Sequence, residues 1–201
     1  YNMKTINNPS KKEALLDAAQ NLMLEKGFVA TTLEEICCAS ETTKGSFFHY
    51  FKSKEELGKE LVERFARGVS DFMEAALLAV GDDPLDRVYA MVDAHIKVSE
   101  KAEFKGCLLG TFSQELSVTH PEIMALCTKR FEDVANIFNE NLSQAKIKYA
   151  PKTSFDVDSL AEYFIAISQG SMIMMKAQQD RSIIKKNLMH FKQYLKYIFG
   201  K

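Results

Sequence analysis

The chain has 201 residues, of which 46% are hydrophobic and 26% charged, and its formal net charge is -1. This composition supports a substantial buried core in one or two domains and excludes an intrinsically disordered chain. The most apolar stretch, Phe164 to Met175, is interrupted by polar residues well short of the roughly 20 residues that span a bilayer. We therefore expect no membrane association and a cytosolic location.

The four cysteines are Cys37, Cys38, Cys107 and Cys127. They lack the C-x-x-C spacing and the nearby histidines of a zinc site, and a cytosolic chain keeps its thiols reduced. No nucleophile, base and oxyanion donor stand out together, and the sequence has no glycine-rich phosphate loop. We therefore expect no metal, no cofactor and no enzymatic activity.

A first helix is expected from Ser10, because Ser10 and Glu13 have the spacing of a capping box. Its apolar residues recur at helical spacing, and Gly27 is expected to end it. These apolar residues are Leu15, Ala18, Ala19, Leu22 and Met23.

Residues 31–57 predict two short helices joined by a tight corner. Thr32 and Glu35 have capping-box spacing at the start of the first helix, and residues 40–42 interrupt its apolar pattern. Thr43 is expected to cap the second helix. Two such helices form a helix-turn-helix, whose second helix can enter the major groove of DNA.

The second short helix carries Phe47 and Phe51, which lie four residues apart and are expected to pack inward. Ser53 and Glu56 form another capping-box pattern, so a third helix is expected to follow almost without a linker.

Between residues 42 and 54 the chain has three lysines, one histidine and no carboxylate. Phosphate binding needs such a local cluster of cations, whereas the net charge mainly sets solubility and long-range steering. The near-neutral net charge therefore neither supports nor excludes DNA binding, and the local cluster supports it.

These residues resemble the bacterial TetR (tetracycline repressor) family of regulators. The shared pattern has a first helix ending in glycine and an aromatic residue, a threonine pair, and a recognition helix beginning (S/T)-K-G. In this chain the matching positions are Ala18-Ala19, Gly27-Phe28, Thr31-Thr32, Ile36, Thr43 to Phe51 and Ser53 to Leu57. The match covers roughly a quarter of the chain, and its many spaced positions make it more specific than a single short motif.

The chain departs from the family pattern at two positions. Glu41 stands where the family usually has glycine at the corner, so the backbone either takes a positive φ with a side chain or turns differently. Phe48 replaces the usual tyrosine, so we expect no phosphate contact through a hydroxyl there.

Lys44 is expected to contact base edges, with Thr43 and Ser46 beside it, while Gly45 lets the helix approach the bases. An alternative role for Tyr50 is that of a packing aromatic. The residues expected to contact phosphates are Thr32, His49, Tyr50 and Lys54.

Residues 1–53 are therefore expected to form a three-helix DNA-binding domain, and residues 54–201 an all-α effector-binding and dimerisation domain. A helix from Lys54 toward Val80 would belong to both and act as a lever. Asp83 and Pro84 are expected to start the next helix, which ends near Phe104.

Three more segments are expected in the second domain before its last two helices. They are a helix at Gly106–Leu116, a long amphipathic helix at Pro121–Ala145 and a polar loop at Lys146–Ser154.

The last two predicted helices each carry a stripe of apolar residues, which is expected to pack against another helix. The stripes either meet within the chain or pair with a second copy; we favour a homodimer joined by a four-helix bundle, because DNA half-sites are read two-fold. The stripe residues are Leu160, Phe164, Ile167, Ser171 and Met174, then Ile184, Leu188, Phe191, Leu195 and Ile198.

A small apolar or electrophilic effector is expected inside the second domain. The alternative is that the same Phe and Met residues are plain core. The candidate lining residues are Met73, Leu77, Tyr89, His95, Phe104, Cys107, Phe112, Phe131, Tyr163 and Met172.

The segment around Gly106-Cys107-Leu108 is similar to a branch of the same family in which some regulators sense electrophiles or oxidants through the thiol. Cys107 is therefore a candidate sensing thiol, and the alternative is a buried packing residue.

We interpret the chain as a sequence-specific DNA-binding regulator, a repressor that an effector or thiol modification releases from double-stranded operator DNA. The main alternative is a helical ligand carrier or partner-binding module that does not use the helix-turn-helix, with Glu41 as its best support. A helical enzyme ranks third.

Overall fold

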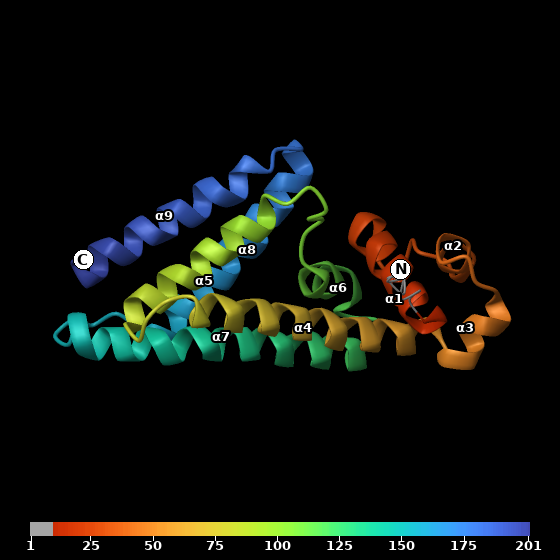
Figure 1. Cartoon of the computed structure of the whole chain (residues 1–201), viewed down its shortest axis with the longest axis horizontal. Coiled ribbons are helices and arrows are strands. Elements are labelled where there is room, and N and C mark those ends of the chain that lie inside the picture. Colours follow the sequence, from red (N-terminus) through yellow and green to blue (C-terminus); the bar gives the residue numbers. More distant parts are fainter. Residues whose placement is uncertain (1–9) are drawn as a thin grey trace, which may run out of the picture. The chain divides into compact units, whose positions relative to one another are not determined.

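The computed structural model describes residues 10–201, and every helix or strand assigned within that range is an α-helix (Figure 1). The predicted all-α class is therefore confirmed. The helices are α1 Lys11–Lys26, α2 Leu33–Ala39, α3 Lys44–Tyr50, α4 Lys54–Leu78, α5 Pro84–Ser99, α6 Leu108–Leu116, α7 Pro121–Tyr149, α8 Val157–Gln178 and α9 Ser182–Phe199.

The described residues pack into two compact units. The first contains the chain up to Arg64 together with Leu108–Leu126, and the second contains Phe65–Cys107 and Cys127–Lys201. The first unit therefore includes α6, which the predicted division at residues 53 and 54 assigned to the effector domain.

In the first unit, α1 packs on α2, α3 and α6, and α2 also packs on α3. The predicted inward residues Phe47 and Phe51 are buried, as is Ile36 of α2. Apolar residues at helical spacing thus place α1, α2 and α3 around one core, as the sequence pattern predicted.

The predicted caps of this unit form as hydrogen bonds. The Ser10 hydroxyl accepts from the Glu13 N–H, and Thr43 accepts from the Ser46 N–H. Thr32 and Glu35 form both halves of the capping box.

The second predicted capping box, at Ser53 and Glu56, is half right. Ser53 Oγ accepts from the Glu56 N–H at 3.2 Å, but the Glu56 carboxylate accepts from the N–H of Lys52 instead of Ser53.

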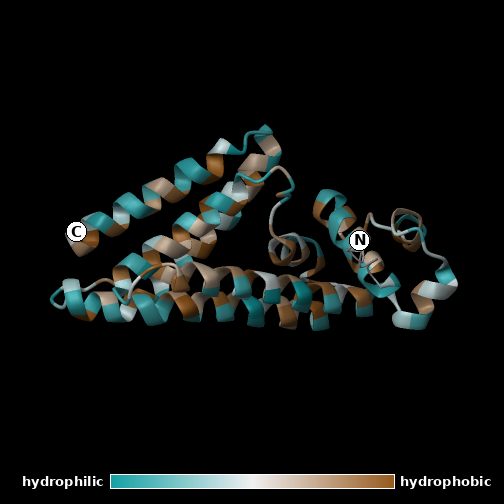
Figure 2. Ribbon diagram, in the orientation of Figure 1, coloured by the Kyte–Doolittle hydropathy of each residue, from teal (hydrophilic) through white to brown (hydrophobic). Residues whose placement is uncertain are grey.

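The second unit is built around one core of apolar residues from α4, α5, α7, α8 and α9. Within it, α9 packs on both α5 and α8. Hydrophobic and hydrophilic residues alternate along α9, as expected of a helix with one buried face (Figure 2).

The end of α5 corrects the prediction, because the helix stops at Ser99 and not near Phe104. Past Ser99, the carbonyl oxygens of Lys101 and Ala102 accept from the Arg181 guanidinium, at the start of α9. These partners lie about 80 residues apart in the sequence, so the local pattern could not predict the contact.

The end of α7 is also corrected, because the helix continues to Tyr149 and residues 146–149 do not belong to a loop. Lys148 and Tyr149 both donate to the carboxylate of Asp83, the N-cap residue of α5. Burial raises the pKa of Asp83, but these hydrogen bonds outweigh it and hold that pKa below its usual value.

Most residues of the α8 and α9 stripes pack within the chain, which is one of the two partners that the sequence left open. The rings of Phe164 and Phe191 lie 5.6 Å apart, and Asn187 donates to Ser171 Oγ at 3.0 Å. The residues that their own chain buries are Leu160, Phe164, Ser171, Ile184, Leu188, Phe191 and Leu195. Buried side chains have no surface left to offer a partner.

The remaining stripe residues differ from these. Ile167 and Ile198 are partly buried against the same core, and Met174 is exposed. The large exposed apolar residues on the two helices are Tyr163, Ile173, Met174, Met189, Tyr194 and Tyr197.

Candidate DNA-binding site

Helix α3 is anchored on one side and open on the other. Phe47 is fully buried, and its ring lies 5.5 Å from that of Phe51. Lys44, Gly45 and Phe48 are exposed, and because positions 44 and 48 are four residues apart they share one stripe of the helix. The exposed stripe is therefore rigidly held and carries the lysine that the sequence predicts to contact base edges.

The other residues predicted to contact DNA lie around this stripe. Thr43, His49 and Tyr50 are exposed, and Ser46 is partly exposed. Thr43 also caps α3, so its hydroxyl already accepts from the Ser46 N–H at 3.1 Å.

The corner before α3 forms with a side chain in the left-handed region. Glu41 has φ of 52°, the first of the two conformations that the sequence left open. The Thr42 N–H donates to Cys37 O at 2.9 Å, and Ser40 Oγ lies 2.9 Å from Thr42 Oγ1. These bonds offset a backbone cost of about 1 kcal/mol.

Lys44 is paired with Glu34 of α2, and both side chains are exposed. The hydrogen bond between the two side chains lowers the pKa of Glu34 and raises the pKa of Lys44. An exposed pair of this kind is weak, so the lysine can leave it for a stronger acceptor such as a guanine edge or a phosphate. The predicted DNA contact of Lys44 would therefore have to displace Glu34.

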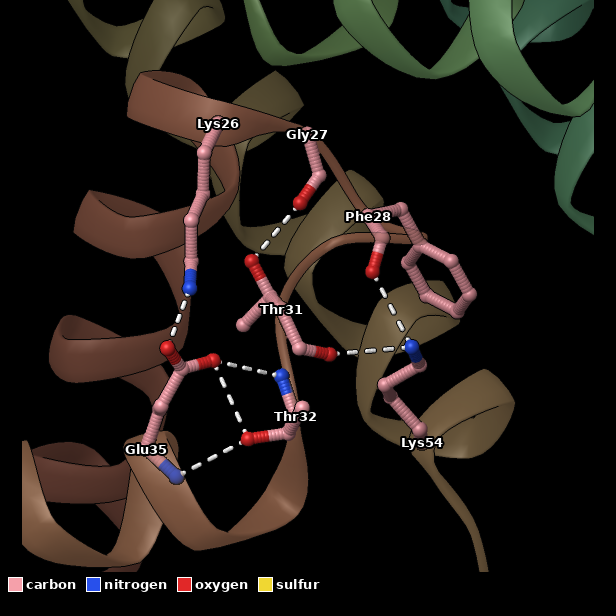
Figure 3. A network of polar contacts seen from close by, with 7 residues as sticks. All are labelled: Lys26, Gly27, Phe28, Thr31, Thr32, Glu35 and Lys54. Atoms are coloured by element: carbon pink, nitrogen blue, oxygen red, sulfur yellow. Dashed lines mark hydrogen bonds and ion pairs between the residues drawn. The ribbon is translucent and has the colours of Figure 1, made fainter.

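Lys54 fastens α4 to the segment between α1 and α2 (Figure 3). Its ammonium donates to the carbonyl oxygens of Phe28 and Thr31, each at 3.0 Å, and lies 4.5 Å above the centre of the Phe28 ring. An ammonium has three N–H groups. Two are used here, so the predicted phosphate contact would depend on the third.

Thr32 lies at the other side of the same network (Figure 3). Its N–H and hydroxyl both contact Glu35 Oε2, at 2.9 and 3.0 Å. The hydrogen bond from Lys26, followed by those from Thr32, lowers the pKa of Glu35 to about 2. A phosphate at Thr32 would have to displace this carboxylate.

A second carboxylate, Glu115 of α6, holds the segment after α1. It accepts from the N–H groups of Phe28 and Val29, at 2.6 and 3.0 Å. Gly27 has φ of +89°, and a Cβ there would lie 2.7 Å from Glu115 Oε2. The positive φ therefore favours glycine at 27, and a Cβ there would also push the Glu115 carboxylate away from its position. Sequence reasoning missed Glu115, because its partners are backbone groups 86 and 87 residues away.

A hollow of about 580 Å³ lies beside α1 and the α2–α3 corner in the same unit. It is lined by the carboxylates of Asp17, Glu25 and Glu41 against one lysine, Lys11. This excess of negative charge is unsuited to phosphate, so the surface of α3 remains the candidate for DNA.

The predicted effector residues do not all lie together. The second core includes Met73 and Met172, with Leu77, Tyr89, Phe104 and Cys107 packed against it. Phe112 is buried in the first unit, with its ring 5.4 Å from that of Phe28. Tyr163 is exposed on α8, and Phe131 is partly exposed on α7.

Polar groups without a hydrogen-bond partner occur inside the second unit. Among the described residues, Tyr89 Oη, His95 Nε2 and Ser168 Oγ are buried and make no hydrogen bond. The His95 ring lies 5.8 Å from that of Phe164, and burial lowers the pKa of His95 to about 4. An effector entering this core would find few polar partners, and neutral His95 is one of them.

Two family models match this chain. The first, described as bacterial regulatory proteins of the tetR family, matches residues 15–61. The second, described as the tetracyclin repressor-like C-terminal domain, matches residues 84–191. The chain belongs to the TetR family. It is a DNA-binding transcriptional regulator, as the residues of the helix-turn-helix predicted.

Relatives with similar sequences carry repressor names. The HTH-type transcriptional repressor DhaR of Mycobacterium sp. strain GP1 is 26% identical over 170 residues, which cover 85% of this chain and 84% of that protein. The HTH-type transcriptional repressor NemR of Escherichia coli K12 is 23% identical over 185 residues, which cover 92% of this chain and 93% of that protein.

Solved structures share the fold. A regulatory protein TetR from Rhodobacter sphaeroides superposes with a TM-score of 0.83 at 23% identity, covering 92% of this chain and 98% of that one. The reduced form of E. coli NemR gives a TM-score of 0.78 at 24% identity, covering 92% and 96%. TetR-family regulators bind operator DNA and function as dimers, and they are generally not enzymes.

Within residues 10–201, none of the helices has both the length and the apolar character needed to cross a bilayer. The same residues contain no group of three or more His, Cys, Asp or Glu side chains placed to hold a metal ion.

Replacing Glu34 by Gln should strengthen DNA binding at low salt about two- to fivefold, because Lys44 loses its competing partner. Fluorescence anisotropy with a labelled duplex measures the change. Glu132→Gln, on α7 in the other unit, changes the net charge equally and is the matched control. Unchanged affinity of Glu34→Gln would show that the ion pair does not compete with DNA.

The lowered pKa of His95 predicts a pH dependence of stability. Between pH of about 4 and 6.5 the unfolded chain binds a proton at this residue and the folded chain does not. Stability should therefore fall as the pH drops through this range, by up to about 3 kcal/mol. Urea unfolding at fixed protein concentration, with His95→Phe, should show a flatter profile than the wild type. The exposed His190, replaced by Gln, is the control and should leave the profile unchanged.

Proposed function

We propose that this protein is a homodimeric repressor whose two copies of α3 enter successive major grooves of a two-fold operator. The observation that carries this proposal is the exposed stripe of α3, with Lys44 and Gly45 on it and Phe47 buried beneath. Half-sites in such dimers lie about 34 Å apart or somewhat more. Lys44 contacts base edges, and the surrounding residues of α3 position the helix on phosphates.

The dimer surface is formed by the exposed apolar residues of α8 and α9. Tyr163, Met174, Tyr194 and Tyr197 are among them, and large exposed apolar side chains gathered on two neighbouring helices indicate a protein contact. The stripe residues of α8 and α9 that are buried within the chain form the core beneath this surface and hold it rigid. TetR-family regulators function as dimers, which supports a dimer here as well.

Release from DNA follows from an event in the second unit. One route is an apolar effector that inserts among Met73, Met172 and their neighbours and hydrogen-bonds to His95. Coupling free energies in such switches are typically about 1 to 3 kcal/mol, which is enough to release an operator.

The other route is modification of Cys107, the residue directly before α6. Its thiol is partly exposed, and the neighbouring backbone at Gly106 lies close to Lys176: a Cβ there would be 3.9 Å from the ammonium. Burial lowers the pKa of Lys176, while negative charge on Cys107 raises it. A cation near a thiol favours the reactive thiolate. One solved relative is described as the reduced form of NemR, which fits a regulator with a redox-dependent state.

The helix-turn-helix is tested by selecting duplexes from a random library with the full-length chain and measuring affinity against salt. If the dimer meets about eight phosphates, log affinity should fall with log salt at a slope near -7. Lys44→Ala should lower the discrimination between bases at one position per half-site by about 1–3 kcal/mol. Failure to select any sequence, or an unchanged preference in Lys44→Ala, would contradict the assigned role.

The thiol route is tested with an electrophile such as N-ethylmaleimide. Treatment should abolish operator binding of the wild type and spare Cys107→Ser, while Cys38→Ser, which removes the exposed thiol of α2, should behave as the wild type does. Equal loss of binding in the wild type and Cys107→Ser would leave the apolar effector as the route of release.

A further inference from the structure

Phe48 is an exposed aromatic residue on the DNA-facing stripe of α3. Its side chain is 54% exposed, whereas the neighbouring Phe47 and Phe51 are buried. Its ring meets Phe47 edge-on, at 5.3 Å and 86°, and this contact fixes the ring at its base. Hydrophobic burial inside the chain therefore does not account for a phenylalanine at this position.

The position of Phe48 places it beside the predicted base-reading residue. It lies one helical turn after Lys44, about 6 Å farther along the helix axis. Gly45 on the same side leaves open space, since a Cβ there would meet only Thr43 Oγ1, at 3.8 Å. Nothing on this stripe would hold the ring of Phe48 away from the floor of a groove.

The chemistry of the ring narrows what it can recognise. Phenylalanine has no hydroxyl, so it cannot donate to a phosphate or to a base edge. The apolar feature that the major groove presents is the C5-methyl group of thymine. We propose that Phe48 is a specificity-determining residue that packs against a thymine methyl in each half-site, within about two base pairs of the Lys44 contact.

This proposal rests on the proposed function, because it requires α3 to lie in the major groove. It adds an apolar contact to the polar contact of Lys44. An apolar contact releases no counterion, so its contribution should be the same at low and high salt, unlike that of the lysine.

The test removes the methyl group from the DNA while leaving the protein unchanged. In the duplex selected by the full-length chain, each thymine is replaced in turn by deoxyuridine, and the affinity of the wild type is measured. We expect a loss of about fourfold at one thymine position per half-site, which is the value of one buried methyl group.

The matching protein variants complete a double-mutant cycle. Phe48→Ala should bind the thymine duplex more weakly and no longer distinguish it from the deoxyuridine duplex. Lys44→Ala, the comparison variant, should keep that distinction. Circular dichroism and thermal unfolding check the fold of each variant, and Phe48→Leu, with a smaller apolar side chain, provides a second variant if Phe48→Ala unfolds.

Three results would overturn the proposal. They are a selected operator without a fixed thymine in each half-site, equal wild-type affinity for both duplexes at every position, and an unchanged ratio in the Phe48 variants. If the unchanged ratio comes with equal weakening of Phe48→Ala on both duplexes, the ring contacts the sugar-phosphate backbone instead. Absence of any DNA binding by the wild type would instead overturn the proposed function itself.

Discussion

The helix-turn-helix depends on a short segment without regular structure that is held from two sides. Lys54 binds the carbonyl oxygens of Phe28 and Thr31, and Glu115 binds the N–H groups of Phe28 and Val29. Backbone groups of this segment, which lies between α1 and α2, thus find charged partners on α4 and α6. Because α2 begins directly after this segment, the direction of α2, and through the corner that of α3, follows from these contacts.

Local signals in the sequence predicted the first unit well. Each of the side chains that start α1, α2 and α3 forms its hydrogen bond within three residues, so spacing alone identified it. The two helix boundaries that were wrong lie beside long-range contacts: Arg181 binds carbonyls beyond α5, and Asp83 accepts from residues at the end of α7. Periodicity cannot show which of two possible partners a stripe meets, and for this reason it could not show that most residues of the α8 and α9 stripes pack within the chain.

The candidate site itself was only partly predictable. The sequence identified Lys44 and its neighbours, because a recognition helix has a recognisable pattern. It could not show that Lys44 is paired with Glu34, or that Lys54 already donates to two carbonyl oxygens. In the proposed interface, Lys44 and Lys54 thus already have protein acceptors, which DNA binding would exchange for nucleic-acid acceptors. Each lysine therefore contributes less to the free energy of DNA binding than a count of positive charges would suggest.

The hydrogen bonds of Glu115 to the segment after α1 have a consequence for engineering. A chimeric regulator made by joining the first 53 residues to a foreign sensor would lose the carboxylate that binds the N–H groups of Phe28 and Val29. A DNA-binding domain that is to be transferred to another protein therefore has to include α6 and the start of α7. These elements are separated from the N-terminal part of the same unit by more than 40 residues of sequence. The first unit consists of two separate stretches of sequence that pack together in the folded chain.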